Sequence, residues 1–150
     1  MTMDRSAQQI KESVGYALAQ LCKAHRYAID EALRAHGLRV GQEMILLELW
    51  THNGCSQSQL AESLCVEPPT VTKMLQRMSA EDLLDRRPDP EDARVSRVFL
   101  SPRARGLEAD VVTAWADVET RATAGMTAEE RILLRRLLIQ VRANLARTDP

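Results

Sequence analysis

Aromatic residues are scarce in this sequence, at 3% of its 150 positions. Proteins that stack single-stranded bases need exposed rings, so this scarcity argues against RRM-like and OB-like binding modules. The sequence also lacks any apolar run near the roughly 18 residues that a membrane-spanning helix requires. Its opening, MTMDRSAQQIKES, has no apolar core of the kind found in secretory signals. We therefore expect a cytoplasmic protein without a membrane partner.

Cysteine is also sparse, and the residues present lack both the C-x-x-C spacing of a zinc ribbon and the even number of a disulfide framework. The histidines stand on different segments and are not paired four residues apart, so we expect no metal site. Ser/His/Asp constellations, paired carboxylates and phosphate-binding glycine loops are missing as well. These absences predict a protein that is not an enzyme and needs no cofactor. The residues concerned are Cys22, Cys55, Cys65, His25, His36 and His52.

What is present is the composition of one ordinary globular domain over residues 1–150, with 45% hydrophobic and 27% charged residues. The net charge is −1, but the charge is unevenly distributed. Residues 68–105 carry eight basic and six acidic side chains, whereas both flanking segments have an acidic excess. Within this middle part, residues 94–105 hold four arginines and no acid. The net charge therefore conceals a local positive field.

Helical signals fill the first half of the chain. Apolar or small residues recur three or four positions apart over residues 10–36, which predicts one long amphipathic helix that Gly37 ends. A second, deeply buried helix is expected over residues 40–50. A Ser-x-x-Gln capping box predicts a third helix over residues 57–64. A proline pair then begins a fourth helix over residues 68–80, since proline is tolerated in the first turn.

The second half of the chain predicts two strands and two more helices. Residues 83–87 and 95–100 have the pattern of short strands joined by a proline-rich tip, which makes a β-hairpin. Pro102 restarts a helix that we expect over residues 104–124. A Thr-x-x-Glu capping box opens a last helix over residues 128–147.

The order of these elements predicts a mainly α fold, a winged helix-turn-helix carried on long terminal helices. Two short helices joined by a tight turn and followed by a hairpin define this motif. Ala61 stands where the first helix must let the second cross closely, and Val71 supplies the inward contact of the second helix. The helix pair alone is equally compatible with an ordinary helical hairpin, and the hairpin after it favours the winged motif.

Two stretches resemble the MarR family of transcriptional regulators: SQSQLAESLCVEPPTVTKMLQRM and LLDRRPDPEDARVSRVFLSPRARGL, the second with an Asp-x-Arg element. The resemblance covers nearly the whole chain. It implies dimerisation helices at about 10–36 and 104–147 and a DNA-binding region at about 40–101. Two residues depart from the family pattern, because the family often has glycine where Cys65 and Asp82 stand.

A winged helix-turn-helix of this kind places the start of its second helix in the major groove of double-stranded DNA. We expect base contacts from its first turns, backbone contacts further along it, and phosphate contacts from the start of the preceding helix. The exposed arginine of the wing is expected to enter the minor groove. The candidate DNA-binding residues are Ser56, Gln57, Pro69, Thr70, Thr72, Lys73, Gln76, Arg77 and Arg94.

Three further charged residues are candidates for support of the wing. By the resemblance, Asp92 should hold the wing by pairing with Arg94 or another basic residue nearby. Arg86 and Arg97 have two open readings, because each can pair with an acidic neighbour or contact a phosphate.

The resemblance implies a homodimeric, ligand-responsive repressor that binds a pseudo-palindromic operator. A small aromatic or phenolic effector is a candidate partner, in a pocket near His25, Met44, Trp50 and Trp115, although such residues are more often plain core. Cys22 lies where OhrR-type relatives carry a peroxide-sensing thiol, and its alternative is a buried packing residue. A protein-interaction module without DNA affinity is the rival class.

Overall fold

The computed structural model describes residues 3–146, and their fold is mainly helical. The helices are α1 (Met3–Lys11), α2 (Val14–Arg34), α3 (Gln42–Thr51), α4 (Gln57–Leu64), α5 (Pro68–Ala80), α6 (Pro102–Gly106), α7 (Glu108–Ala122) and α8 (Ala128–Ala146). Two strands, β1 (Leu84–Pro88) and β2 (Ser96–Leu100), form an antiparallel hairpin between α5 and α6. No helix of this described part is long and apolar enough to cross a membrane.

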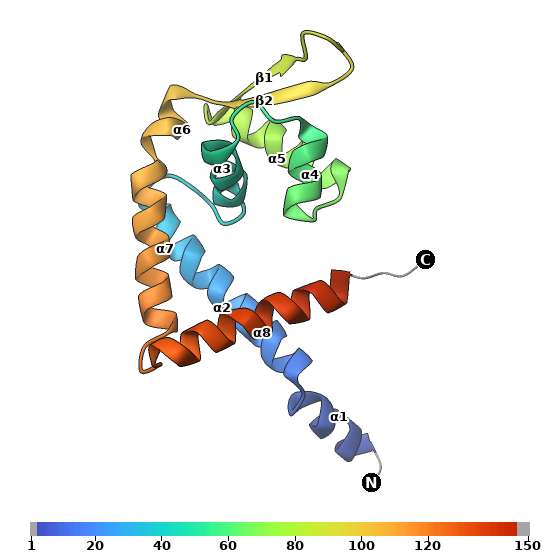
Figure 1. The fold of residues 1–150 in the computed structure, drawn as a ribbon, viewed down its shortest axis with the longest axis vertical. Coiled ribbons are helices and arrows are strands. Elements are labelled where there is room, and N and C mark those ends of the chain that lie inside the picture. The colour runs from blue at the N-terminus through green and yellow to red at the C-terminus, as the bar shows by residue number, and fades with distance from the viewer. Residues whose placement is uncertain (1–2, 147–150) are drawn as a thin grey trace.

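Figure 1 shows that α3, α4, α5 and the hairpin gather at one end of the molecule, and that α2 and α7 lead away from it. α2 and α7 contact each other. α8 crosses α2 in this view, and α1 continues beyond α2 toward the N-terminus. The elements predicted from the sequence are thus present in the predicted order, and the winged helix-turn-helix is confirmed.

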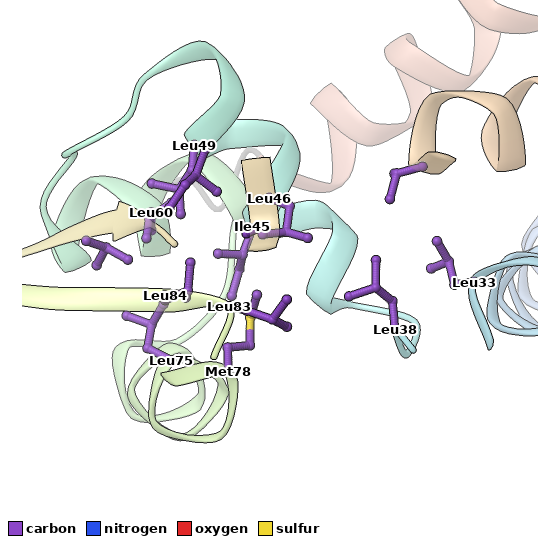
Figure 2. Packing of buried hydrophobic residues seen from close by; sticks show 14 of the residues in the cluster. Leu33, Leu38, Ile45, Leu46, Leu49, Leu60, Leu75, Met78, Leu83 and Leu84 are labelled. Atoms are coloured by element: carbon purple, nitrogen blue, oxygen red, sulfur yellow. The ribbon is translucent and has the colours of Figure 1, made fainter. Parts of the chain in front are cut away.

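We call α3, α4, α5 and the hairpin the winged unit. The core lies where this unit meets the end of α2. Figure 2 shows that one buried cluster extends from Leu60 and Leu75 past Leu46 to Leu33. Full burial of such a side chain contributes about 1.5–3 kcal/mol. Ala61 of α4 and Val71 of α5 are both buried, as the crossing of the two helices requires.

The helix expected over residues 10–36 is in fact two helices. The chain leaves the α conformation at Ser13, whose hydroxyl donates to the Ile10 carbonyl at 2.7 Å and accepts from the Tyr16 backbone N–H at 3.1 Å. The apolar spacing continues across this break, so the periodicity alone could not reveal it. At the other end α2 stops at Arg34, and Gly37 has the predicted left-handed backbone, with φ of 72°.

The second predicted helix begins two residues late, at Gln42. Gly41 has φ of 100°, and its N–H donates to the Glu43 carboxylate at 2.6 Å. Glu43 is only 2% exposed, and burial raises the pKa of its carboxyl. The helix is also less buried than predicted, because Met44 is 42% exposed.

Smaller differences from the predicted elements occur after α5, the helix predicted to read DNA bases. β1 is shifted one residue toward the C-terminus, and β2 begins one residue late but ends at Leu100 as predicted. The helix expected over residues 104–124 is divided at Leu107 into α6 and α7. The Thr127–Glu130 capping box is present, with both of its hydrogen bonds formed. The last residue of the predicted final helix, Arg147, lies outside the described residues.

Cys65 and Asp82, the two departures from the family's glycines, both have left-handed backbones, with φ of 52° and 57°. Cys65 ends α4, and its N–H reaches back to the carbonyls of the last turn. Residues with a Cβ adopt this region at some cost, which explains why glycine suits these two turns. The turn geometry is preserved without it.

Candidate nucleic-acid interface

The start of α5 forms an exposed polar surface on the winged unit. The Pro68-Pro69 pair opens the helix, where a missing backbone N–H costs nothing. Val71, Leu75 and Met78 are buried and fix the helix against the core. The opposite side is exposed and carries Pro69, Thr70, Lys73, Gln76 and Arg77. Five of the nine predicted DNA-binding residues therefore share one exposed face.

Arg77 lies at the edge of this face. It borders a hollow of about 250 Å³ whose other walls include Asp30, Gly41 and Met74, so it adjoins the connection between α2 and α3. The pKa of the Asp30 carboxyl is lowered, because it accepts from the Val40 backbone N–H and pairs with Arg34.

On the opposite edge, Thr72 is half-buried and already hydrogen-bonded. Its hydroxyl accepts from the Gln57 side-chain amide and donates to the Pro68 carbonyl at 3.0 Å. The Gln57 amide oxygen in turn accepts from Arg86 of β1 at 3.2 Å. Two residues predicted to contact DNA and one predicted to support the wing are thus linked to each other.

Ser56 performs the predicted capping role. Its hydroxyl oxygen accepts from the Gln59 N–H at 3.1 Å, and its own N–H donates to the Gln59 side chain at 2.8 Å. Its hydroxyl hydrogen can still be donated to a phosphate.

The wing carries Arg94, whose side chain is 91% exposed. Its guanidinium donates to both oxygens of Asp92, at 3.0 and 3.3 Å, and Asp92 also accepts the Arg94 backbone N–H at 3.1 Å. These bonds hold the pKa of the Asp92 carboxyl below its usual range. Asp92 therefore pairs with Arg94, and the remaining N–H groups of the arginine point to no protein acceptor in the described part of the chain.

Arg97 is the second predicted support, and it pairs with Asp89. Its guanidinium pairs with the Asp89 carboxylate and also donates to the Gly54 carbonyl at 3.0 Å. Asp89 accepts the backbone N–H groups of Glu91 and Asp92 at 2.8 and 3.1 Å, so it fixes the turn at the tip. The Arg97 pairing and these N–H groups lower the pKa of the Asp89 carboxyl.

Asp89 was missed in the sequence analysis. The sequence does contain a signal for it, because an aspartate that follows a proline at a hairpin tip is typical of an Asx turn. Its ion pair with Arg97 depends on the strand register, which the sequence does not display.

Predicted DNA-binding residues of the wing and of the α4 start border one hollow of about 370 Å³. Its walls come from the starts of α4 and α5 and from the wing, including Ser56, Gln57, Pro68, Arg86 and Arg94. A concave surface lined by two arginines beside an exposed helix start is suited to an anionic backbone.

The predicted effector residues do not all lie together. His25 and Trp115 are in edge-to-face contact, with ring centroids 5.4 Å apart. Trp50 donates its indole N–H to the Ala104 carbonyl at 3.2 Å, as a half-buried core residue does, and Met44 is exposed. The Trp115 indole N–H is buried without a hydrogen-bond partner among the described residues. The effector pocket stays a prediction.

Cys22 is exposed on α2, so the packing alternative is not realised within a single chain. In the part of the chain that the structure describes, no three His, Cys, Asp or Glu side chains are grouped to hold a metal ion.

The middle of the chain is similar to a known family. The MarR family model matches residues 38–96. The regulator TtmR of Methylorubrum extorquens is 29% identical over 101 residues, which are 67% of this chain and 52% of TtmR, so the chain spans about half the length of that relative. The repressor NicR of Pseudomonas putida is 24% identical over 136 residues, or 91% of this chain and 86% of NicR.

Solved structures agree in fold. A probable transcriptional regulator from Pseudomonas aeruginosa has a TM-score of 0.81 at 25% identity, covering 88% of this chain and 98% of its own. Mutant MarR from E. coli, complexed with operator DNA, has a TM-score of 0.81 at 22% identity, covering 85% and 92%. Bordetella bronchiseptica BpsR, whose DNA binding is regulated by 6-hydroxynicotinic acid, has a TM-score of 0.81 at 24% identity, covering 93% and 96%. The winged helix-turn-helix at residues 38–96 is therefore similar to that of the MarR family.

Proposed function

We propose that this protein is a transcriptional regulator that binds double-stranded DNA in a sequence-specific manner. The observation that carries the proposal is the shared surface of the α5 start and Arg94, on either side of the hollow at the wing. The α5 residues would read base edges in the major groove, and Arg94 would enter the minor groove. The likeness to MarR, which was solved with operator DNA, supports this arrangement.

The protein would act as a homodimer. Large apolar side chains are exposed on α8, with Ile132 at 71%, and none of the residues of α8 from Ala128 to Ala146 is buried within the chain. Ile10, Val14 and Tyr27 are exposed on α1 and α2. Residues 10–36 and 104–147 would cover these side chains in the dimer, while residues 40–101 bind DNA. Two reading helices would then face the two halves of a pseudo-palindromic operator.

We further propose a ligand-responsive repressor with no catalytic role, which acts on operator DNA in the cytoplasm. NicR is named as a repressor, and the DNA binding of BpsR responds to 6-hydroxynicotinic acid. A small aromatic acid is therefore the effector class to test, with the contact of His25 and Trp115 as the place to look for it.

The test is selection of bound duplexes from a random DNA pool with the purified protein. We expect an inverted repeat to be enriched, with half-sites about one helical turn apart. Enrichment of no sequence, together with weak binding that vanishes as salt rises, would favour the rival protein-interaction module.

A further inference from the structure

A polar chain joins the wing to the reading helix through Gln57. Arg86 of β1 donates to the Gln57 amide oxygen at 3.2 Å. The Gln57 amide nitrogen donates to the Thr72 hydroxyl, and that hydroxyl donates to the Pro68 carbonyl at 3.0 Å. Gln57 and Thr72 are half-buried, and three elements, α4, α5 and β1, each contribute to the chain.

The groups at the two ends fix the direction of every hydrogen bond in between. A guanidinium only donates, so the Gln57 atom that faces Arg86 must be the oxygen. The amide nitrogen then faces Thr72 and donates to it. A carbonyl only accepts, so the single hydroxyl hydrogen of Thr72 goes to Pro68. The Thr72 hydroxyl therefore has no hydrogen left to offer and keeps one free lone pair.

We propose that Gln57 is a positioning residue that holds Thr72 in one orientation for reading a base. This inference rests on the proposed function, since it concerns the same DNA-binding surface. Held in this way, Thr72 offers a methyl group and an acceptor, but no donor. It suits the thymine methyl and the amino groups of adenine and cytosine. It disfavours guanine, whose major-groove edge presents only acceptors, N7 and O6.

The same series of hydrogen bonds fixes how the wing and the reading helix lie relative to each other on DNA. Arg86 stands on the strand that leads to the wing, and Thr72 stands on the reading helix. Gln57 lies at the first position of α4, next to the capping residue that fixes its backbone. A single amide between them ties the wing to the helix, and the tie holds only while Arg86 keeps the amide oriented.

The experiment repeats the selection from a random duplex pool with four variants: Gln57→Leu, Arg86→Leu, Thr72→Val and the double variant Gln57→Leu/Thr72→Val. Wild type should disfavour guanine about tenfold at one base pair of each half-site. Gln57→Leu removes the amide that holds Thr72 and Arg86→Leu leaves that amide free to turn, so Thr72 is then held by the Pro68 bond alone and this discrimination should fall several-fold. Thr72→Val keeps the methyl without a hydroxyl and should still disfavour guanine. The double variant should behave like Thr72→Val.

Arg87→Leu is the matched control, since it removes an equal charge from the same strand. Arg87 lies over the Phe99 ring, 4.8 Å from its centroid, and pairs with Asp85 rather than with Gln57. It should weaken binding to all sequences alike and leave the base preference unchanged. Thermal melts of all variants check that each one folds.

The inference is overturned if Gln57→Leu selects the wild-type sequence, or if its effect persists unchanged in the Thr72→Val background. If the wild-type protein has enriched a sequence motif, either result would leave the proposed function intact. Failure of the wild type to enrich any sequence would overturn both.

Discussion

At the scale of single residues, Arg94 shows how an exposed charge can be held ready for a narrow groove. A free arginine loses considerable side-chain entropy when a groove orders it. Here the Asp92 carboxylate already orients the guanidinium, because it accepts two bonds from that group and a third from the Arg94 backbone N–H. Asp92 is thus a positioning group, and its negative charge itself would repel phosphate.

Substitution of this arginine gives the first prediction. Arg94→Ala should weaken operator binding by about 1–3 kcal/mol, the range of a good base contact, and leave folding and dimerisation unchanged because the side chain adds nothing to the core. Arg121→Ala, an exposed arginine of α7, is the control. Equal affinities of Arg94→Ala and wild type, measured at matched salt, would refute the role of the wing.

Cys22 gives the second prediction. Lys23 is one position along α2 and so does not face the thiol, and the His25 ring packs against Trp115. We therefore expect hydroperoxide to affect operator binding equally in wild type and in Cys22→Ser, as measured by fluorescence anisotropy. Release of DNA by peroxide in wild type alone would instead establish a thiol sensor.

At the scale of elements, the wing is attached to the helical unit by a short segment that acts as a third strand. The Gly54 N–H donates to the Val98 carbonyl at 2.9 Å, and Val98 donates to the Cys55 carbonyl at 3.0 Å. Ser56 continues this pairing as a bridge opposite Arg97. The segment between α3 and α4 therefore sets where the hairpin leaves the core.

Gly54 makes this close approach possible, which yields the third prediction. Its φ is 89°, and an added Cβ would lie 2.7 Å from a ring carbon of Phe99. Gly54→Ala should destabilise the protein by about 1–3 kcal/mol and lower its melting temperature by several degrees. Gly106→Ala is the control, because nothing lies within 4 Å of its added Cβ. Identical melting temperatures of Gly54→Ala and wild type would contradict the close approach of Gly54 to Phe99.

The same elements show what could be predicted from the sequence. The starts of α4, α5 and α8 were predicted correctly because capping boxes and the proline pair act within four residues. The breaks at Ser13 and Leu107 were not, since apolar spacing continues through them. The site was predicted as a set of residues, but not as a network. Hydrogen bonds such as Arg86 to Gln57 join residues 29 positions apart and depend on tertiary packing.

At the scale of the whole molecule, α8 has no residue from Ala128 to Ala146 that is buried within the chain. Most of its apolar side chains share one broad face, since Leu133 and Leu137 lie about 40° apart at 100° per residue, while Ile132 and Ile139 lie on the other side. An apolar face on a helix is normally buried against a neighbouring element. Its exposure in one chain therefore favours a partner that covers it.

Removal of α8 gives the fourth prediction. A chain that ends at Thr127 loses no buried residue of the described core, so its helical circular dichroism per residue should persist. The interface would be gone, and light scattering should give a monomer or an aggregate. The single change Leu137→Asp, on the exposed surface of α8, should shift the full chain in the same direction. A stable truncated dimer would refute this interface.

We propose above that two copies of this chain bind together to one pseudo-palindromic DNA site. The most direct measurement is the mass of the complex with the selected duplex, by analytical ultracentrifugation, for the intact site and for a duplex with one half-site scrambled. We predict two chains on one intact duplex, and a loss of affinity of at least about tenfold when half the site is scrambled. One chain per duplex, or equal affinity for both duplexes, would contradict the account.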